Sequence, residues 1–329
     1  MISTDFSHLA AHRHIDRSEI LALAEWRRAG LKTCLLTIIA IDGKSPRSVG
    51  AQMAVNELGQ TQGYLTGGCL EHELAAVARA LIQSGRNEIR RYGRGSPYID
   101  MRLPCGSGID IYFDQALPDA LVFQAESLVQ TRRPFTLLMN LANGTSSINP
   151  SNSTAAHRAQ QQVQGDWFER RYKPILRLRI FGAGFASVQL AFLARSAGIC
   201  VDLYTNDDIS ISAAAALGIV AEPIRPRDHQ VEGSDDWTAS TLMFHEHDLE
   251  TVILAQLVKQ PGFYIGAIGN SLVNQQRADA LRAMGVSDTA IKRIVMPAGL
   301  VRQARNATEI AVGVLGEVLD VARTSGLVV

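Results

Sequence analysis

The sequence has few cysteines, no excess of charge of either sign and no long apolar run. Four of its 329 residues are cysteine, too few for the disulfide framework of a secreted scaffold. Its 32 basic residues equal its 32 acidic residues, which argues against nucleic-acid binding through a broad basic surface. No stretch reaches the roughly 18 apolar residues of a membrane-spanning helix, and the polar N-terminus lacks a signal-peptide core. We therefore expect a cytoplasmic α/β protein with reduced thiols.

The length predicts two domains, because single hydrophobic cores rarely grow to this size. We expect the first domain in residues 1–141, a polar loop or linker in 142–172, and the second domain in 173–329. Residues 142–165 are polar and show no hydrophobic period, which is typical of a surface loop or linker. An ordered loop crossing the first domain fits these residues equally well.

Two glycine-rich turns of the first domain each carry a cysteine. Cys69 follows Gly67 and Gly68 and precedes a predicted helix, whereas Cys105 precedes a predicted strand. The positive end of a helix dipole lowers the pKa of a thiol and makes thiolate available. A thiolate at Cys69 can bind a soft metal or carry sulfur. A buried cysteine packed behind a glycine turn is an equal alternative.

A third loop, SPRSVG, places Arg47 among small residues that expose backbone N–H groups. A guanidinium there can grip a phosphate with two hydrogen bonds, although a solvated loop arginine is commoner. The two remaining cysteines, Cys34 and Cys200, lie in apolar stretches. We expect both in the hydrophobic core.

From residue 175 onward, predicted strands and helices alternate, which indicates a parallel, doubly wound sheet. Gly182 and Gly184 follow an apolar strand and open a helix, the context in which a turn seats a phosphate on a helix N-terminus. A site for NAD also needs an acidic residue at the end of the second strand. This chain has Thr205 there, so the pattern favours a phosphate-bearing ligand over NAD(P).

A cluster of His245, Glu246 and His247 follows a predicted strand of the second domain. In a doubly wound sheet, that edge faces the ligand crevice. The cluster could supply metal ligands or an acid–base group. A metal-dependent hydrolase is therefore one alternative, which stoichiometric zinc or manganese in the purified protein would support.

Several motifs together resemble the XdhC/CoxI family, the accessory proteins of molybdenum hydroxylases. In the first domain they are SPRSVGAQM (45–53), GYLTGGCLE (63–71) and CGSGIDIYF (105–113). In the second they are RIFGAG (179–184), FHEHDLE (244–250), YIGAIG (264–269), PAGL (297–300) and ATEIAVGVLGEV (307–318). The resemblance implies an N-terminal α/β XdhC/CoxI-like domain plus a C-terminal Rossmann-like doubly wound parallel sheet.

The resemblance also implies a function. Family members bind the molybdenum cofactor (molybdopterin), keep it available for sulfuration and help insert it into a partner apoenzyme. Such partners are xanthine dehydrogenases, carbon monoxide dehydrogenases or aldehyde oxidoreductases. A sulfur-donating cysteine desulfurase is a further expected partner, and a homodimer is expected by analogy. The chain is thus expected to act as a maturation factor rather than as a catalyst.

The resemblance singles out Cys69 as the residue that contacts the cofactor, including its molybdenum, with Cys105 as the next candidate. Together with the motifs above, the full set of expected cofactor-binding residues is Cys69, Gly67, Gly68, Glu71, Arg47, Cys105, Gly182, Gly184, His245 and Glu246. The turn at Gly182 would seat a second phosphate if the cofactor is a dinucleotide. An NAD(P)-dependent oxidoreductase using the Rossmann-like domain is the main alternative.

Overall fold

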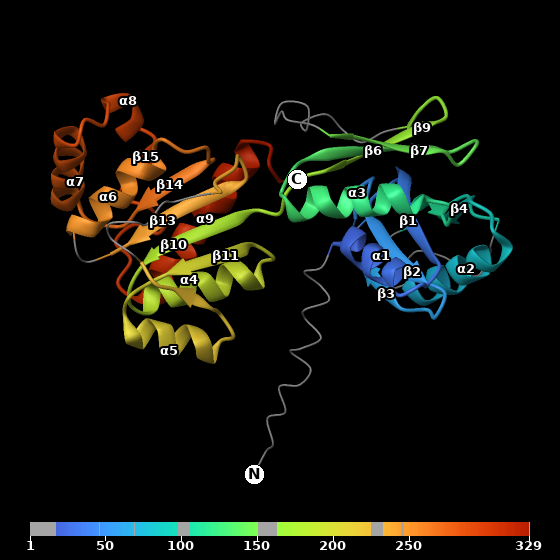
Figure 1. Ribbon diagram of the computed structural model, residues 1–329, viewed down its shortest axis with the longest axis horizontal. Helices are drawn as coiled ribbons and strands as arrows, with labels where there is room; N and C mark the ends of the chain where they lie inside the picture. Colours follow the sequence, from blue (N-terminus) through green and yellow to red (C-terminus); the bar gives the residue numbers. More distant parts are fainter. Residues whose placement is uncertain are drawn as a thin grey trace, which may run out of the picture. The chain divides into compact units, whose positions relative to one another are not determined.

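The computed structural model describes residues 18–45, 47–68, 70–97, 106–150, 163–224, 233–244 and 247–328, with backbone alone for 247 and 248. These residues form two compact units, Met1–Pro174 and Ile175–Val329, coloured blue to green and yellow to red in Figure 1. Each unit has its own hydrophobic clusters.

The first unit combines three helices and nine strands among its described residues. They are α1 (Glu19–Arg28), β1 (Thr33–Asp42), β2 (Gln52–Asn56), β3 (Thr61–Gly63), α2 (Glu71–Ser84), β4 (Glu88–Gly93), β5 (Gly108–Asp114), α3 (Asp119–Gln130), β6 (Phe135–Asn140), β7 (Ser146–Pro150), β8 (Val163–Gln164) and β9 (Trp167–Tyr172). Two antiparallel sheets result, in the orders β3-β2-β1-β5-β4 and β7-β6-β9-β8.

Strand β1 organises the first unit because both of its faces are buried. Successive side chains of a strand point to opposite faces. Cys34, Leu36 and Ile38 accordingly join the cluster beneath α2, whereas Leu35 and Ile39 join the cluster formed with α1, α3 and the second sheet. The first sheet is therefore packed on both sides, and α1 lies beside α3 (Figure 1).

Residues 142–172 differ from the expected polar loop or linker, because they contain β7, β8 and β9. Phe168 and Tyr172 of β9 are buried, and the ring of Tyr172 stacks on Phe135 at 4.4 Å between centroids. Between Phe168 and Tyr172 lie three charged residues, Glu169, Arg170 and Arg171. Because of them, the sequence here lacks the apolar pattern of a strand. The boundary between the units falls at Pro174.

The second unit is a Rossmann fold. Its elements are β10 (Arg177–Gly182), α4 (Phe185–Ser196), β11 (Cys200–Tyr204), α5 (Asp208–Ala216), β12 (Ala221–Glu222), β13 (Thr238–Met243), α6 (His247–Leu257), β14 (Tyr264–Ala267), α7 (Ser271–Ala283), α8 (Asp288–Ile291), β15 (Ile294–Val295) and α9 (Ala307–Thr324). The parallel sheet has the order β12-β11-β10-β13-β14-β15. The chain reverses its winding between β10 and β13, where such sheets bind ligands.

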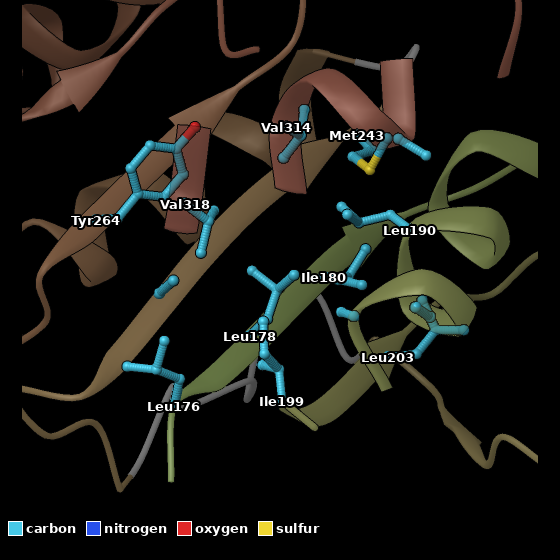
Figure 2. Close-up of a cluster of buried hydrophobic side chains, with 14 of the residues drawn as sticks. Leu176, Leu178, Ile180, Leu190, Ile199, Leu203, Met243, Tyr264, Val314 and Val318 are labelled. Carbon is cyan, nitrogen blue, oxygen red and sulfur yellow. The ribbon is translucent and has the colours of Figure 1, made fainter. Parts of the chain in front are cut away.

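Helices cover both faces of this sheet. Figure 2 shows one face, where Leu178 and Ile180 of β10 pack against Leu190 of α4 and against Val314 and Val318 of α9. The other face is covered by α6 and α7 in a separate cluster. This confirms the predicted doubly wound sheet.

The two core cysteines expected from the sequence have different environments. Cys34 is buried, as predicted, but the prediction for Cys200 is wrong because its side chain is exposed. Cys200 is the first residue of β11, and at this end of the strand the apolar stretch does not bring burial of the side chain. In the part of the chain that the structure describes, no helix is both long and apolar enough to cross a bilayer.

Candidate functional site

The glycine turn before α2 is the best-defined candidate site of the first unit. Four of the predicted cofactor-binding residues, Cys69, Cys105, His245 and Glu246, lie outside the described residues. Their roles remain predictions. The residues flanking Cys69 on both sides are described, and they define the turn that carries it.

The carboxylate of Glu71 holds this turn together. Its Oε1 accepts hydrogen bonds from the backbone N–H groups of Leu65 (3.0 Å) and Thr66 (2.7 Å). Its Oε2 accepts from the N–H groups of Gly68 (2.8 Å) and Leu70 (3.2 Å) and from the hydroxyl of Thr66 (2.8 Å). Both carboxylate oxygens accept hydrogen bonds from the turn, so the side chain of Glu71 fixes the backbone conformation of the turn.

These hydrogen bonds also keep Glu71 ionised. Partial burial by itself raises the pKa of a carboxylate, but the hydrogen bonds from Thr66 and Leu65 outweigh it and lower the pKa of Glu71 below its usual value. Glu71 was expected among the cofactor-binding residues. Its geometry supports a positioning role, in which it acts on a ligand through the backbone that it fixes.

Gly67 and Gly68 leave the turn open. Their φ angles are +76° and +105°, a region that residues with a Cβ rarely adopt. Apart from the residues directly before and after each glycine, no atom of the described residues lies within 4 Å of the position that a Cβ would occupy. Backbone conformation, rather than crowding by other described residues, therefore requires these glycines.

Arg47 lies beside the start of the same turn. Its guanidinium stacks over the ring of Tyr64, 4.4 Å from the centroid, and Tyr64 immediately precedes Leu65. The buried Nε of Arg47 has no hydrogen-bond partner in the described part of the chain. A buried donor without a partner is costly, and an anion at this position would remove that cost. These residues therefore fit a phosphate-bearing cofactor.

In the second unit, the turn at Gly182 lies at the carboxyl end of β10. A Cβ on Gly182 would lie 2.5 Å from the carbonyl oxygen of Met243 on the neighbouring strand, so this glycine permits close backbone packing. Gly184 is the N-cap of α4 with φ +85°, and open space surrounds its Cβ position among the described residues. The predicted strand–turn–helix context is confirmed.

One of the N–H groups of this turn is already occupied. The N–H of Gly184 donates to Oγ of Ser210 at 2.8 Å, and that hydroxyl donates to Oδ2 of Asp207 at 2.5 Å. Thr205, at the place where NAD sites carry an acidic residue, is fully buried. The N–H groups of the first turn of α4 have no acceptor within the helix. They are the donors that remain for a diphosphate at this turn.

A buried ion pair near the carboxyl edge of the sheet was not predicted from the sequence. The guanidinium of Arg277 on α7 donates to Glu250 of α6 at 2.7 Å and to the carbonyl oxygen of Ile268 at 2.9 Å. Arg277 and Glu250 are 3% and 1% exposed, so the pair fixes α6 against α7 without facing solvent. Glu250 is the last residue of the FHEHDLE motif, and this motif was the feature of the sequence that could have pointed to the ion pair. Within the described ranges, no three or more His, Cys, Asp or Glu residues are grouped as a metal site.

Comparison with known proteins identifies the family of this chain. Residues 178–318 match the XdhC Rossmann domain, and residues 26–93 match the XdhC and CoxI family. The two matches fall in separate units, in the order expected from the motifs. The chain belongs to the XdhC/CoxI family.

Individual relatives extend this similarity over most of the chain. The chain is 30% identical over 310 residues to the molybdenum cofactor insertion chaperone PaoD of Escherichia coli strain K12, covering 94% of this chain and 88% of PaoD. It is 23% identical to a probable xanthine dehydrogenase subunit of Bacillus subtilis strain 168, covering 89% and 94% respectively. A crystal structure of a xanthine dehydrogenase from Bacillus halodurans shares the fold, with a TM-score of 0.70, 20% identity and coverage of 94% and 96%.

Proposed function

We propose that this protein binds the molybdenum cofactor and delivers it to the apoenzyme of a molybdenum hydroxylase. The observation that carries the proposal is the open glycine turn braced by Glu71 beside the buried, unpartnered Nε of Arg47. The similarity to PaoD supports the same role. Partners of this class are xanthine dehydrogenases, carbon monoxide dehydrogenases and aldehyde oxidoreductases, and we propose that the protein acts in the cytoplasm.

Each part of the turn has a distinct task in this proposal. Cys69 contacts the molybdenum end of the cofactor or its sulfur donor, because a thiolate is a ligand that soft metals prefer. Arg47 and the N–H groups of its loop hold the phosphate. Glu71 keeps Gly67 and Gly68 in the conformation that exposes the turn. The cofactor supplies the redox-active molybdenum, and the protein binds, orients and shields it.

Further parts of the proposal concern sulfuration and assembly. A cysteine desulfurase would supply the sulfur, with Cys69 and Cys105 as the candidate acceptors. Gly182 and Gly184 would seat a second phosphate of a dinucleotide form, and His245 and Glu246 are proposed as further cofactor contacts. We also propose a homodimer, by analogy with the family.

An NAD(P)-dependent oxidoreductase has weaker support. The Rossmann topology favours it, but Ser210 occupies the N–H of Gly184 and Thr205 replaces the acidic residue. Neither the Glu71 network nor Arg47 has a role in that function. Saturable binding of NAD(P) by the purified protein would support this alternative.

The test of the proposal is cofactor capture. The wild-type protein, Cys69→Ala and Cys200→Ala are purified anaerobically from molybdenum-replete cells, and bound molybdenum and pterin are measured. Cys200 is the matched control because its thiol is exposed but belongs to the other unit. We expect wild type and Cys200→Ala to retain the cofactor and Cys69→Ala to lose most of it. Equal retention by all three proteins would refute the role of Cys69.

A further inference from the structure

The glycine turn of the Rossmann unit is connected by hydrogen bonds to a carboxylate of the neighbouring helix. The N–H of Gly184 donates to Oγ of Ser210 at 2.8 Å. Ser210 in turn donates twice to Oδ2 of Asp207, from its hydroxyl at 2.5 Å and from its backbone N–H at 2.9 Å. Helix α5, whose N-cap is Asp207, packs beside α4 (Figure 1). The carboxylate of Asp207 is therefore two hydrogen bonds away from the turn.

This carboxylate is fixed in position and ionised at neutral pH. Ser210, which donates to it twice, is 1% exposed, and capping ties Asp207 to the first turn of α5. The hydrogen bonds from Ser210 lower the pKa of Asp207 below its ordinary value. A ligand at the glycine turn therefore meets a permanent negative charge.

The glycine turn has little that could offset this charge. Residues 182–187 read GAGFAS and contain no cationic side chain. Two N–H groups of the turn are used within the chain, since that of Ala183 donates to the carbonyl oxygen of Met243 at 3.4 Å and that of Gly184 donates to Ser210. A phosphate would depend on the N–H groups that begin α4 and on the helix dipole, which is equivalent to roughly half an elementary charge. The full negative charge of Asp207 is larger than that.

We propose that Asp207 determines the ligand choice of the Rossmann unit by weakening the binding of nucleotide diphosphates at the start of α4. The carboxylate and the diphosphate have charges of the same sign, and these repel each other. In an NAD site the acidic residue ends the second strand and accepts from a ribose hydroxyl. In this chain Thr205 has that place, and Oδ2 of Asp207 already accepts twice from Ser210.

This role of Asp207 does not rest on the proposed carrier function. If both hold, a dinucleotide form of the molybdenum cofactor gains most of its affinity from the first unit. The Rossmann turn then contributes a weak contact to the second phosphate, and a free nucleotide such as NAD binds poorly because it has no other site to hold it.

The experiment removes the charge and keeps the helix cap. Asn caps helices about as well as Asp, so Asp207→Asn changes the charge alone. Affinity for pyrophosphate is measured by titration calorimetry on the full-length protein at neutral pH, in a metal-free buffer of low salt. All proteins also carry Arg47→Gln, so that the phosphate site proposed in the first unit does not contribute. We expect Asp207→Asn to tighten binding about fivefold, and high salt to reduce this gain.

The matched control is Asp208→Asn. It removes a charge of the same sign from the next residue, which is exposed in the first turn of α5. Because an exposed charge is screened by solvent, we expect this variant to change the affinity less than about twofold. A gain of affinity in Asp207→Asn is also a result that a loss of folding would not produce.

Three results with pyrophosphate would overturn the proposal: no gain in Asp207→Asn, an equal gain in Asp208→Asn, or no binding by any of the proteins. Titration with NAD separates the two possible roles of an acidic residue here. Tighter binding of NAD by Asp207→Asn supports repulsion of the diphosphate, whereas weaker binding would show that Asp207 binds the ribose and would overturn the proposal. Neither titration involves the molybdenum cofactor, so cofactor capture tests the proposed function separately.

Discussion

At the scale of single residues, the buried carboxylate of Asp114 lowers the free energy of unfolding at neutral pH, where it is ionised. It is 1% exposed at the end of β5, and its Oδ2 has no hydrogen-bond partner in the described part of the chain. Burial raises its pKa from the ordinary 3.8 to about 6, although hydrogen bonds from Ala116 and Asn87 oppose the rise. The protonated form of Asp114 is therefore more favourable in the folded protein than in the unfolded chain.

The sign of the resulting pH dependence follows from that preference. Because the folded pKa lies above the unfolded value, the stabilisation is complete below the unfolded pKa near pH 4 and is lost as the pH rises through about 6. We expect Asp114→Asn to be more stable than wild type at pH 8 by about 2 kcal/mol, and to lack this loss. Urea unfolding of both proteins between pH 4 and 8 measures this difference in the free energy of unfolding. Asp166→Asn, in an exposed turn, is the control, and an unchanged pH profile in Asp114→Asn would contradict the account.

At the scale of secondary-structure elements, the close approach of β10 and β13 depends on Gly182. A Cβ there would lie 2.5 Å from the carbonyl oxygen and 2.6 Å from the carbonyl carbon of Met243, and a strand backbone has little freedom to move away. We expect Gly182→Ala to lower the free energy of unfolding by about 3 kcal/mol. Gly184→Ala is the matched control in the same turn. Among the described residues its new Cβ has no close contact beyond its chain neighbours, and its φ of +85° is the source of strain, at a cost of about 1 kcal/mol. Equal losses in denaturant unfolding would contradict this difference.

Most elements with regular patterns were predictable from the sequence. The continuous apolar run at 34–41 is typical of a central strand, and the segment after Cys69 has apolar residues at helical spacing. The structure has β1 and α2 at these places. Asn306 and Glu309 have the residue types and spacing of a capping box, and Asn306 caps α9 by accepting from the N–H of Glu309 at 2.9 Å. Strand β9 was not predictable, because its buried face has only two apolar anchors and the strand is stabilised by partners distant in sequence.

The candidate site was predictable in its position but not in its contacts. The glycines, Arg47 and Glu71 stand out in the sequence because of their residue types. The sequence does not specify where their side chains point. The stack of Arg47 on Tyr64 and the ion pair of Glu250 with Arg277 join residues from different elements, and tertiary packing decides such pairs.

At the scale of the whole molecule, the chain combines two units with separate cores and separate candidate sites. PaoD and the Bacillus subtilis relative both match nearly the whole chain, so the two units occur together in them as well. We propose that the first unit binds the cofactor through the turn fixed by Glu71 and through Arg47. A further phosphate would bind at the N-terminus of α4 in the Rossmann unit under the same proposal.

The most direct test of the central claim is transfer of the cofactor. The protein loaded with molybdenum cofactor is mixed anaerobically with a cofactor-free molybdenum hydroxylase, and the activity and molybdenum content of the enzyme are followed. We expect molybdenum to leave the carrier as the enzyme becomes active, faster than with the same amount of free cofactor, and we expect no acceleration with Cys69→Ala. Activation that is equally fast with free cofactor, or a carrier that keeps its molybdenum, would contradict the carrier function.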